Sequence, residues 1–262
     1  MKKIIIAGLF LSFSVLGVTL SHATTVLDLT TAGSSGFVTS DSTGGSALYQ
    51  QGSALVVGTG NIQSFAQLQN KGIEEGYNTT VNGTFDIGSS ATFNHELLLS
   101  DIPIVNIDGT DYRQFLLDVH QDTPHSLLSL DEIQIFQSNT ANQSVTTFTG
   151  GVLGLTDSNL IYRLNPTGTR GSYTDGYIEL DSILTSGSGN GVDMIAYIPN
   201  SVFEFNDPYV YLYSYFGQPD PTNATFEEWA VLKNPTSAVP EPQSLALLSP
   251  ALLGLFFRRK MA

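Results

Sequence analysis

Neighbouring carboxylates are the first residues whose types could support catalysis. Three such pairs occur in the chain: Glu74-Glu75, Asp131-Glu132 and Glu227-Glu228. Hydrolysis of a glycosidic bond needs two carboxyl groups that face each other at a defined separation. Adjacent residues of a strand point to opposite faces, so no pair can supply that geometry alone. Two carboxylates from different strands could still meet, and otherwise these acids are solvated or locally hydrogen-bonded.

Hard oxygen ligands are also abundant between residues 101 and 132. Ca²⁺ takes roughly six to eight oxygens, often from loops. Two loop-like stretches carry the candidate calcium ligands, which are Asp108, Asp111, Asp118 and Asp122. Neither stretch fits the EF-hand pattern, and Asp108-Gly109 is equally a turn signal. Calcium is the one cofactor that the sequence suggests, with a plain turn as the alternative.

Other catalytic signatures are missing from the sequence. His95, His120 and His125 lie in no His-Glu-x-x-His motif, so we expect surface or half-buried histidines. No serine occupies a Gly-x-Ser-x-Gly elbow on a clear strand-to-helix turn. The chain has no Cys, which excludes disulfides, thiolate metal sites and Cys nucleophiles. We therefore predict no catalytic residue.

One row of tyrosines could bind sugars. Tyr209, Tyr211, Tyr213 and Tyr215 alternate with other residues and so share one face of a predicted strand. Aromatic rings on an exposed sheet face can stack on sugar rings and would form a glycan contact. Alternatively, the face is half-buried and the rings pair with aromatic residues of neighbouring strands.

Short alternating runs must position these residues, and Gly, Asn, Asp, Ser and Pro separate them, as is typical of strands and turns. Strands are expected in the ranges 46–57, 145–148, 160–164, 177–181, 192–198 and 209–216. Leu160, Tyr162 and Leu164 should share one face. The pattern predicts an all-β fold, an antiparallel β-sandwich that could be jelly-roll-like, as one domain over residues 24–237.

Two further expectations concern local structure. Residues 62–71 and 127–131 are the only stretches in which short helical turns are expected. Around Trp229, the only Trp, Glu228 should point away from the face that carries Glu227 and Trp229. We expect this Trp to be a core residue near the end of the domain.

The charge balance limits the partners. The formal net charge is −14, and five basic residues stand against 23 acidic ones between the two ends, which gives that region −18. Nucleic-acid binding needs basic patches and is disfavoured. Divalent cations or a hydrated matrix would be natural neighbours, and solubility alone is the simpler explanation.

The N-terminus has the three parts of a secretory signal peptide. Lys2 and Lys3 precede an apolar run over residues 4–20, and Ser21-His22-Ala23 is a small-x-small cleavage site. We expect signal peptidase to remove residues 1–23, with a retained membrane anchor as the alternative. The mature chain is then exported across the inner membrane.

The C-terminus resembles a short membrane segment. The apolar run Leu245–Phe257 would form a helix of about 20 Å, shorter than a hydrocarbon core of about 30 Å. Residues 238–244 and snorkelling of Arg258, Arg259 and Lys260 bring it near spanning length. The basic cluster should stay cytoplasmic, which places the body outside.

A tetrapeptide before this run carries a specific resemblance. Val239-Pro240-Glu241-Pro242 is an extended, helix-refusing segment. Together with the Leu-rich run and the basic end, residues 238–262 resemble the PEP-CTERM sorting signal of Gram-negative bacteria. The resemblance implies recognition of Pro240, Glu241 and Pro242 by exosortase, a membrane transpeptidase, and association with exopolysaccharide or biofilm matrix. Pro250 inside the run departs from the pattern and would kink it.

The body carries a weaker resemblance, to blocks that recur in one group of uncharacterised PEP-CTERM proteins. Examples are Glu75-Gly-Tyr-Asn-Thr79 and Phe226-Glu-Glu-Trp-Ala230. This implies one continuous domain and no activity. We expect a non-enzymatic protein of the cell surface or extracellular matrix, anchored transiently by its C-terminal helix and associated with extracellular polysaccharide. The alternative is an extracellular glycan hydrolase that uses loop carboxylates.

Overall fold

The computed structural model describes residues 26–39, 45–52, 62–164, 170–171, 176–185, 191–204 and 206–233. These residues are all-β and contain no α-helix, only two short 3₁₀ turns, η1 (Leu99–Asp101) and η3 (Asn200–Val202). Within the same ranges, no helix has the length and apolar character needed to cross a membrane.

The first sheet of the described residues has seven strands. Its main order is β1 (Val26–Asp28), β14 (Tyr177–Asp181), β10 (Leu127–Ser138), β16 (Tyr209–Phe216) and β6 (Glu74–Tyr77). In addition, β13 (Ser158–Arg163) pairs with β10, and β7 (Leu97–Leu98) pairs with β16. The pairings are antiparallel except for β1 with β14, which is parallel.

The second sheet of the described residues also has seven strands and is antiparallel. Its order is β2 (Ser35–Thr39), β3 (Ser46–Gln51), β15 (Met194–Pro199), β9 (Thr110–Val119), β18 (Glu227–Leu232) and β4 (Ile62–Leu68), and β8 (Ile104–Ile107) pairs with β9. Two small ribbons complete the described fold: β11 (Phe148–Thr149) with β12 (Val152–Leu153), and β5 (Lys71–Gly72) with β17 (Thr222–Asn223).

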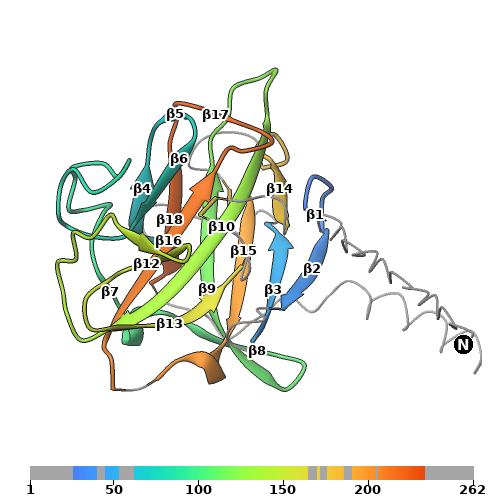
Figure 1. The fold of residues 1–262 in the computed structure, drawn as a ribbon. Helices are drawn as coiled ribbons and strands as arrows, with labels where there is room; N and C mark the ends of the chain where they lie inside the picture. The colour runs from blue at the N-terminus through green and yellow to red at the C-terminus, as the bar shows by residue number, and fades with distance from the viewer. Residues whose placement is uncertain are drawn as a thin grey trace, which may run out of the picture.

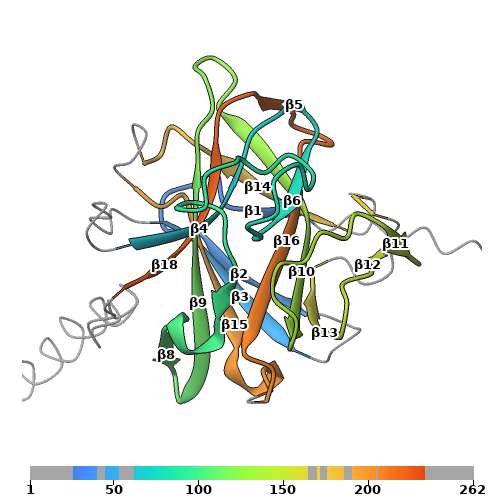
Figure 2. The same ribbon diagram turned by 90° about the vertical axis from the view of Figure 1, so that its left-hand side faces the viewer.

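The two sheets form the layers of a sandwich (Figure 1; Figure 2). Strand alternation puts Trp229 and Val231 of β18 in the core between the layers, opposite Val210 and Leu212 of β16. Trp229 is fully buried, and its Nε1–H donates a hydrogen bond to Ser214 Oγ at 3.1 Å. The predicted core role of the only Trp is thus confirmed.

Each sheet also carries apolar residues on its outer face. On the first sheet, β11 and β12 lie outside β10 and β16 (Figure 2) and help to cover a second apolar cluster. On the second sheet, a third cluster includes Leu116, Ile195 and Ala230. A strand that is covered on both sides has few positions that need a polar residue, so β16 carries tyrosines on its outer side and mostly apolar residues on its core side.

Two local predictions are wrong. Residues 62–71 and 127–131 form strands β4 and β5 and the start of β10, because pairing with neighbouring strands outweighs their weak helical pattern. Leu160 lies in the outer cluster whereas Tyr162 lies in the core, because the register of β13 shifts opposite Ile135 and Phe136. A bulge of this kind adds one residue and reverses the facing of the residues beyond it.

Candidate functional site

The tyrosines predicted to contact glycan lie largely inside the protein. The row consists of Tyr209, Tyr211, Tyr213 and Tyr215, and only Tyr209 is more than slightly exposed. Phe148 of β11 packs against Tyr213 with 5.4 Å between ring centroids. Sugar rings cannot stack on Tyr211 or Tyr213 in this arrangement, so the predicted contact on this row is corrected. The alternative, aromatic packing, is what the fold contains.

The four predicted calcium ligands do not form one site. Asp108 occupies the turn between β8 and β9, where Asn106 Nδ2 donates a hydrogen bond to Asp111 Oδ1 at 2.6 Å. Asp118 lies near the other end of β9, about 23 Å from Asp111 at roughly 3.3 Å per residue, and Asp122 follows the end of that strand. Among the described residues, no group of three or more His, Cys, Asp or Glu could hold a metal ion.

Two of the predicted neighbouring acids meet between the sheets. Glu74 and Glu227 are fully buried. Glu74 Oε2 accepts a hydrogen bond from the N–H of Asn70 at 2.8 Å, and Glu227 Oε1 accepts one from Gln121 Nε2 at 2.5 Å. Their other oxygens, Glu74 Oε1 and Glu227 Oε2, are also buried, and the two carboxyls interact closely enough that each shifts the pKa of the other.

Burial controls the protonation of this pair. It raises the pKa of Glu74 to about 7 and the pKa of Glu227 well above its usual value, to which the charge of Glu74 also contributes. The pair therefore retains a proton at neutral pH. Because neither side chain reaches solvent, the pair cannot touch an extracellular polymer and is a structural feature.

The pair Asp131-Glu132 is also structural. Arg163 Nη2 lies 2.8 Å from Glu132 Oε1, and the N–H of Gly171 donates to Glu132 Oε2 at 2.8 Å. Asp131 Oδ2 accepts a hydrogen bond from the N–H of Gln218 at 2.8 Å. Burial raises the pKa of Asp131 to about 7. Local hydrogen bonding, one of the two alternatives for these acids, is therefore what the fold shows.

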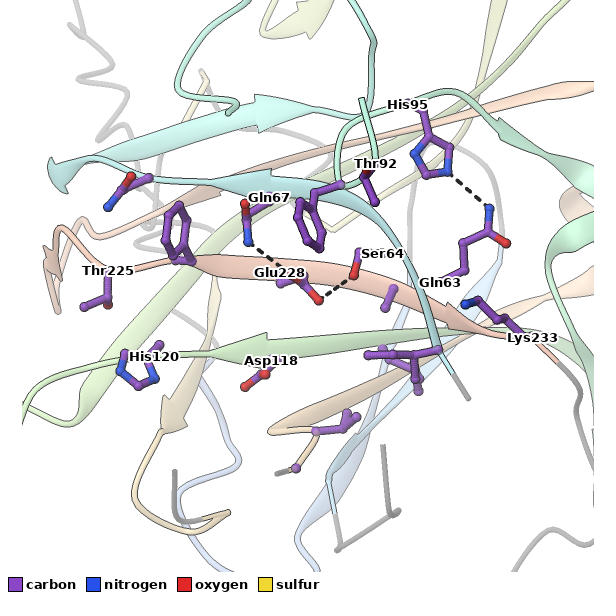
Figure 3. Close-up of a pocket in the computed structure, with 18 of the residues that line it drawn as sticks. Gln63, Ser64, Gln67, Thr92, His95, Asp118, His120, Thr225, Glu228 and Lys233 are labelled. Carbon is purple, nitrogen blue, oxygen red and sulfur yellow. Dashed lines mark hydrogen bonds between the residues drawn. The ribbon is translucent and has the colours of Figure 1, made fainter. Parts of the chain in front are cut away.

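A groove on the outer face of the second sheet is the strongest candidate site (Figure 3). Its volume is about 920 Å³. Strands β4, β18 and β9 form its floor, and the segments 92–95 and 224–226 contribute to its walls. Polar side chains on the floor include Ser64, Gln67, Asp118 and Glu228. The groove therefore combines hydrogen-bonding groups from three strands that are distant in sequence.

Glu228 is held rigidly on this floor. Ser64 Oγ donates a hydrogen bond to Glu228 Oε1 at 2.5 Å, and Gln67 Nε2 donates one to Oε2 at 3.2 Å (Figure 3). Both donors come from the neighbouring strand β4. Asp118 is the register partner of Glu228 on the other side, in β9. Side chains of directly opposed residues start about 5 Å apart, so two carboxylates lie side by side in the groove.

A buried acid, Asp193, lies beside Asp118, because it directly precedes β15, the neighbour of β9. Asp193 is 3% exposed, and its Oδ2 accepts a hydrogen bond from the N–H of Val119 at 2.7 Å. Thr185 Oγ1 donates to its other oxygen. Burial raises the pKa of Asp193 to about 7, and its carboxyl is hydrogen-bonded to that of Asp118. The charge of the neighbouring Asp118 contributes to this rise in pKa, so the buried Asp193 is protonated below about that pH.

Apolar and imidazole groups complete the groove. Phe93 and Phe226 are 39% and 43% exposed and belong to its two walls. His95 Nε2 lies 3.2 Å from Gln63 Nε2, and His120 stands at the end of β9. His95 and His120 are half-buried and His125 is exposed, as expected. No pattern in the sequence indicated that two of the three histidines share one groove.

Comparison with known proteins adds no assignment. Scans against protein-family models, curated proteins and solved structures give no significant match. The predicted signal peptide (1–23), the Val239–Pro242 motif and the basic residues 258–260 lie outside the described residues. The groove is thus the feature of the described body from which a function can be argued.

Proposed function

We propose that this chain is an exported, non-enzymatic protein of the bacterial surface or extracellular matrix that binds polysaccharide in the groove. In this proposal signal peptidase removes residues 1–23. A C-terminal transmembrane helix then holds the jelly-roll-like sandwich outside the inner membrane until exosortase acts at Pro240, Glu241 and Pro242. The signal-peptide pattern at the N-terminus and the Pro-Glu-Pro motif before the C-terminal apolar run support the sorting route. The groove supports the proposed binding of polysaccharide.

The observation that carries the binding proposal is the pairing of exposed aromatic walls with a fixed polar floor. Sugars present apolar C–H faces and many hydroxyl groups. Phe93 and Phe226 offer exposed rings for the apolar faces. Ser64, Gln67 and Glu228 form a hydrogen-bonded set that is already ordered, so that little side-chain entropy is lost on binding.

Binding can be measured with residues 24–238, which include every described strand. Affinity electrophoresis through gels that contain a polysaccharide reports retardation. Phe226→Ala should weaken binding about tenfold, because covering a Phe ring contributes roughly 1.5 kcal/mol or more. Phe37→Ala is the matched control, since Phe37 is 64% exposed on β2 and does not line the groove. Equal retardation of both variants and the parent would contradict the groove as the binding site.

One observation favours a second candidate, the extracellular glycan hydrolase. Asp118 and Glu228 are directly opposed on the neighbouring strands β9 and β18, so two carboxyls project from the same part of the groove floor, as a pair of catalytic acids would. The carboxylates would then come from strands, in contrast to the expected loops. Such an enzyme needs one of the two facing carboxyls to act as a general acid and the other as the nucleophile. Reducing-sugar release that disappears in Glu228→Gln would establish the hydrolase and refute the non-enzymatic proposal.

The sorting route has its own experiment. Glu241→Ala should block removal of the C-terminal segment in a host that contains exosortase. The measurement is electrophoretic mobility of the protein together with its release to the surface. A variant that is processed and released like the parent would exclude Glu241 as a recognition residue.

A further inference from the structure

The charged residues of the groove limit which polysaccharides it can bind. This inference rests on the proposed binding of polysaccharide in the groove. Asp118 and Glu228 contribute two carboxylates to the floor. Besides His95 and His120, Lys233 is the basic residue among the described lining, and its backbone lies five residues beyond Glu228, about 16 Å away along the strand. The centre of the floor is therefore negative and would repel a uronate or sulfated polymer.

The positions of Asp118 and Glu228 favour the binding of a cation. Like charges directly opposite each other on neighbouring strands destabilise a sheet. Here both side chains nevertheless line the groove, and Glu228 is held in position by Ser64 and Gln67. A cationic group between them would relieve their repulsion and bind both.

The aromatic walls indicate what carries that cation. Phe93 and Phe226 are exposed on the same groove and match the apolar face of a sugar better than the hydration shell of a metal ion. We propose that the groove binds a polysaccharide of free-amine hexosamine units, with a sugar ring against Phe226 or Phe93 and its ammonium group between Asp118 and Glu228. A charged amine donates three hydrogen bonds, which the carboxylates can accept.

The test compares two oligosaccharides that differ only at nitrogen. Binding of residues 24–238 to a β-1,4-linked glucosamine hexamer and to its fully N-acetylated form is measured by calorimetry near pH 6. The free-amine hexamer should bind about two- to fivefold more tightly, as expected for one exposed ion pair. This advantage should shrink in high salt, since screening weakens exposed charge pairs.

Two variants distinguish the effect of the groove carboxylates from the effect of the protein's overall negative charge. In Glu228→Gln the affinity ratio of the two hexamers should fall toward one, because a neutral amide cannot distinguish the ammonium group by charge. Glu204→Gln removes the same charge from an exposed position outside the groove and should keep the parent's ratio. An unchanged ratio in Glu228→Gln would overturn the assignment of the amine to these carboxylates.

The remaining outcomes distinguish this inference from the proposed function. If both hexamers bind equally and Phe226→Ala weakens both, glycan binding stands and the amine preference is refuted. If neither hexamer binds and no other polysaccharide retards the protein, both are refuted. If an oligouronate binds only with Ca²⁺ and is released by EDTA, a metal bridge occupies the space between the carboxylates and the amine proposal is wrong.

Discussion

The buried pair Glu74–Glu227 should make the stability of this protein fall as the pH rises. Burial raises the pKa of Glu74 from its usual 4.5 to about 7 in the folded chain. Between those two values the folded chain holds a proton that the unfolded chain has released, so unfolding becomes easier with increasing pH. The stabilisation is complete below about pH 4.5 and is lost as the pH passes through 7.

The size of the effect can be worked out from the same two values. A difference of about 2.5 pKa units corresponds to about 3 kcal/mol at 1.36 kcal/mol per unit. Glu74→Gln replaces the carboxyl group that titrates near pH 7 with a neutral amide. Its Nε2 can donate to Glu227 Oε2, and its Oε1 can still accept the hydrogen bond from the N–H of Asn70. Part of this effect is already lost below pH 5, so between pH 5 and pH 8 we expect the free energy of unfolding of the variant to fall by about 2.5 kcal/mol less than that of the parent.

Urea unfolding at pH 5, 6, 7 and 8 measures this difference, with Trp229 fluorescence as the probe, because that single Trp is fully buried in the folded state. Glu204→Gln is the control, since it removes one carboxylate from an exposed position and changes the net charge equally. Asp131 and Asp193 contribute to the pH dependence of every variant and cancel in the comparison. Parallel curves for Glu74→Gln and the parent would refute the raised pKa of Glu74.

Three further changes test the packing. Arg163→Met leaves the buried carboxylate of Glu132 without its 2.8 Å ion pair and should cost roughly 3–5 kcal/mol in urea unfolding; a cost under about 1 kcal/mol would show that the other donors to Glu132 suffice. Gly217→Ala should lower the melting temperature by several degrees, because φ is +99° there and a Cβ would lie 2.1 Å from the carbonyl oxygen of Gly72; an unchanged melting curve would contradict this close approach. Trp229→Ala should cost about 3–5 kcal/mol by calorimetry, and a small loss would mean that the core closes around the deletion.

Local patterns predicted much of the fold. The strand over Tyr209–Phe216 has the bounds that the alternation predicts, as does the strand over Tyr177–Asp181. The opposite facing of Glu228 and Trp229 was also predictable, because it depends only on the period of a strand. These features need no knowledge of what packs against them.

The wrong predictions all depend on partners that are distant in sequence. The tyrosine row alternates like a solvent-facing row, and its burial comes from β11 and other segments that cross the outer face. The groove likewise joins residues of β4, β9 and β18, which strand pairing brings together. A Ser and a Gln in a weakly patterned stretch carry no signal until β4 is known to lie beside Glu228. The sequence therefore identified the acidic residues as candidates, but it could not show which of them lie together in the groove.

The order of the strands has a consequence for when this protein can fold. The first strand, β1, pairs with β14, and β18 fills the position between β9 and β4 in the second sheet. That sheet keeps a gap until residue 232 has been made, about 10 to 40 s after residue 26 at roughly 5–20 residues per second. Until then apolar strands such as β16 have no complete layer to cover them. A nascent chain of this topology needs chaperones or prompt translocation, and its sandwich closes only once nearly the whole polypeptide is present.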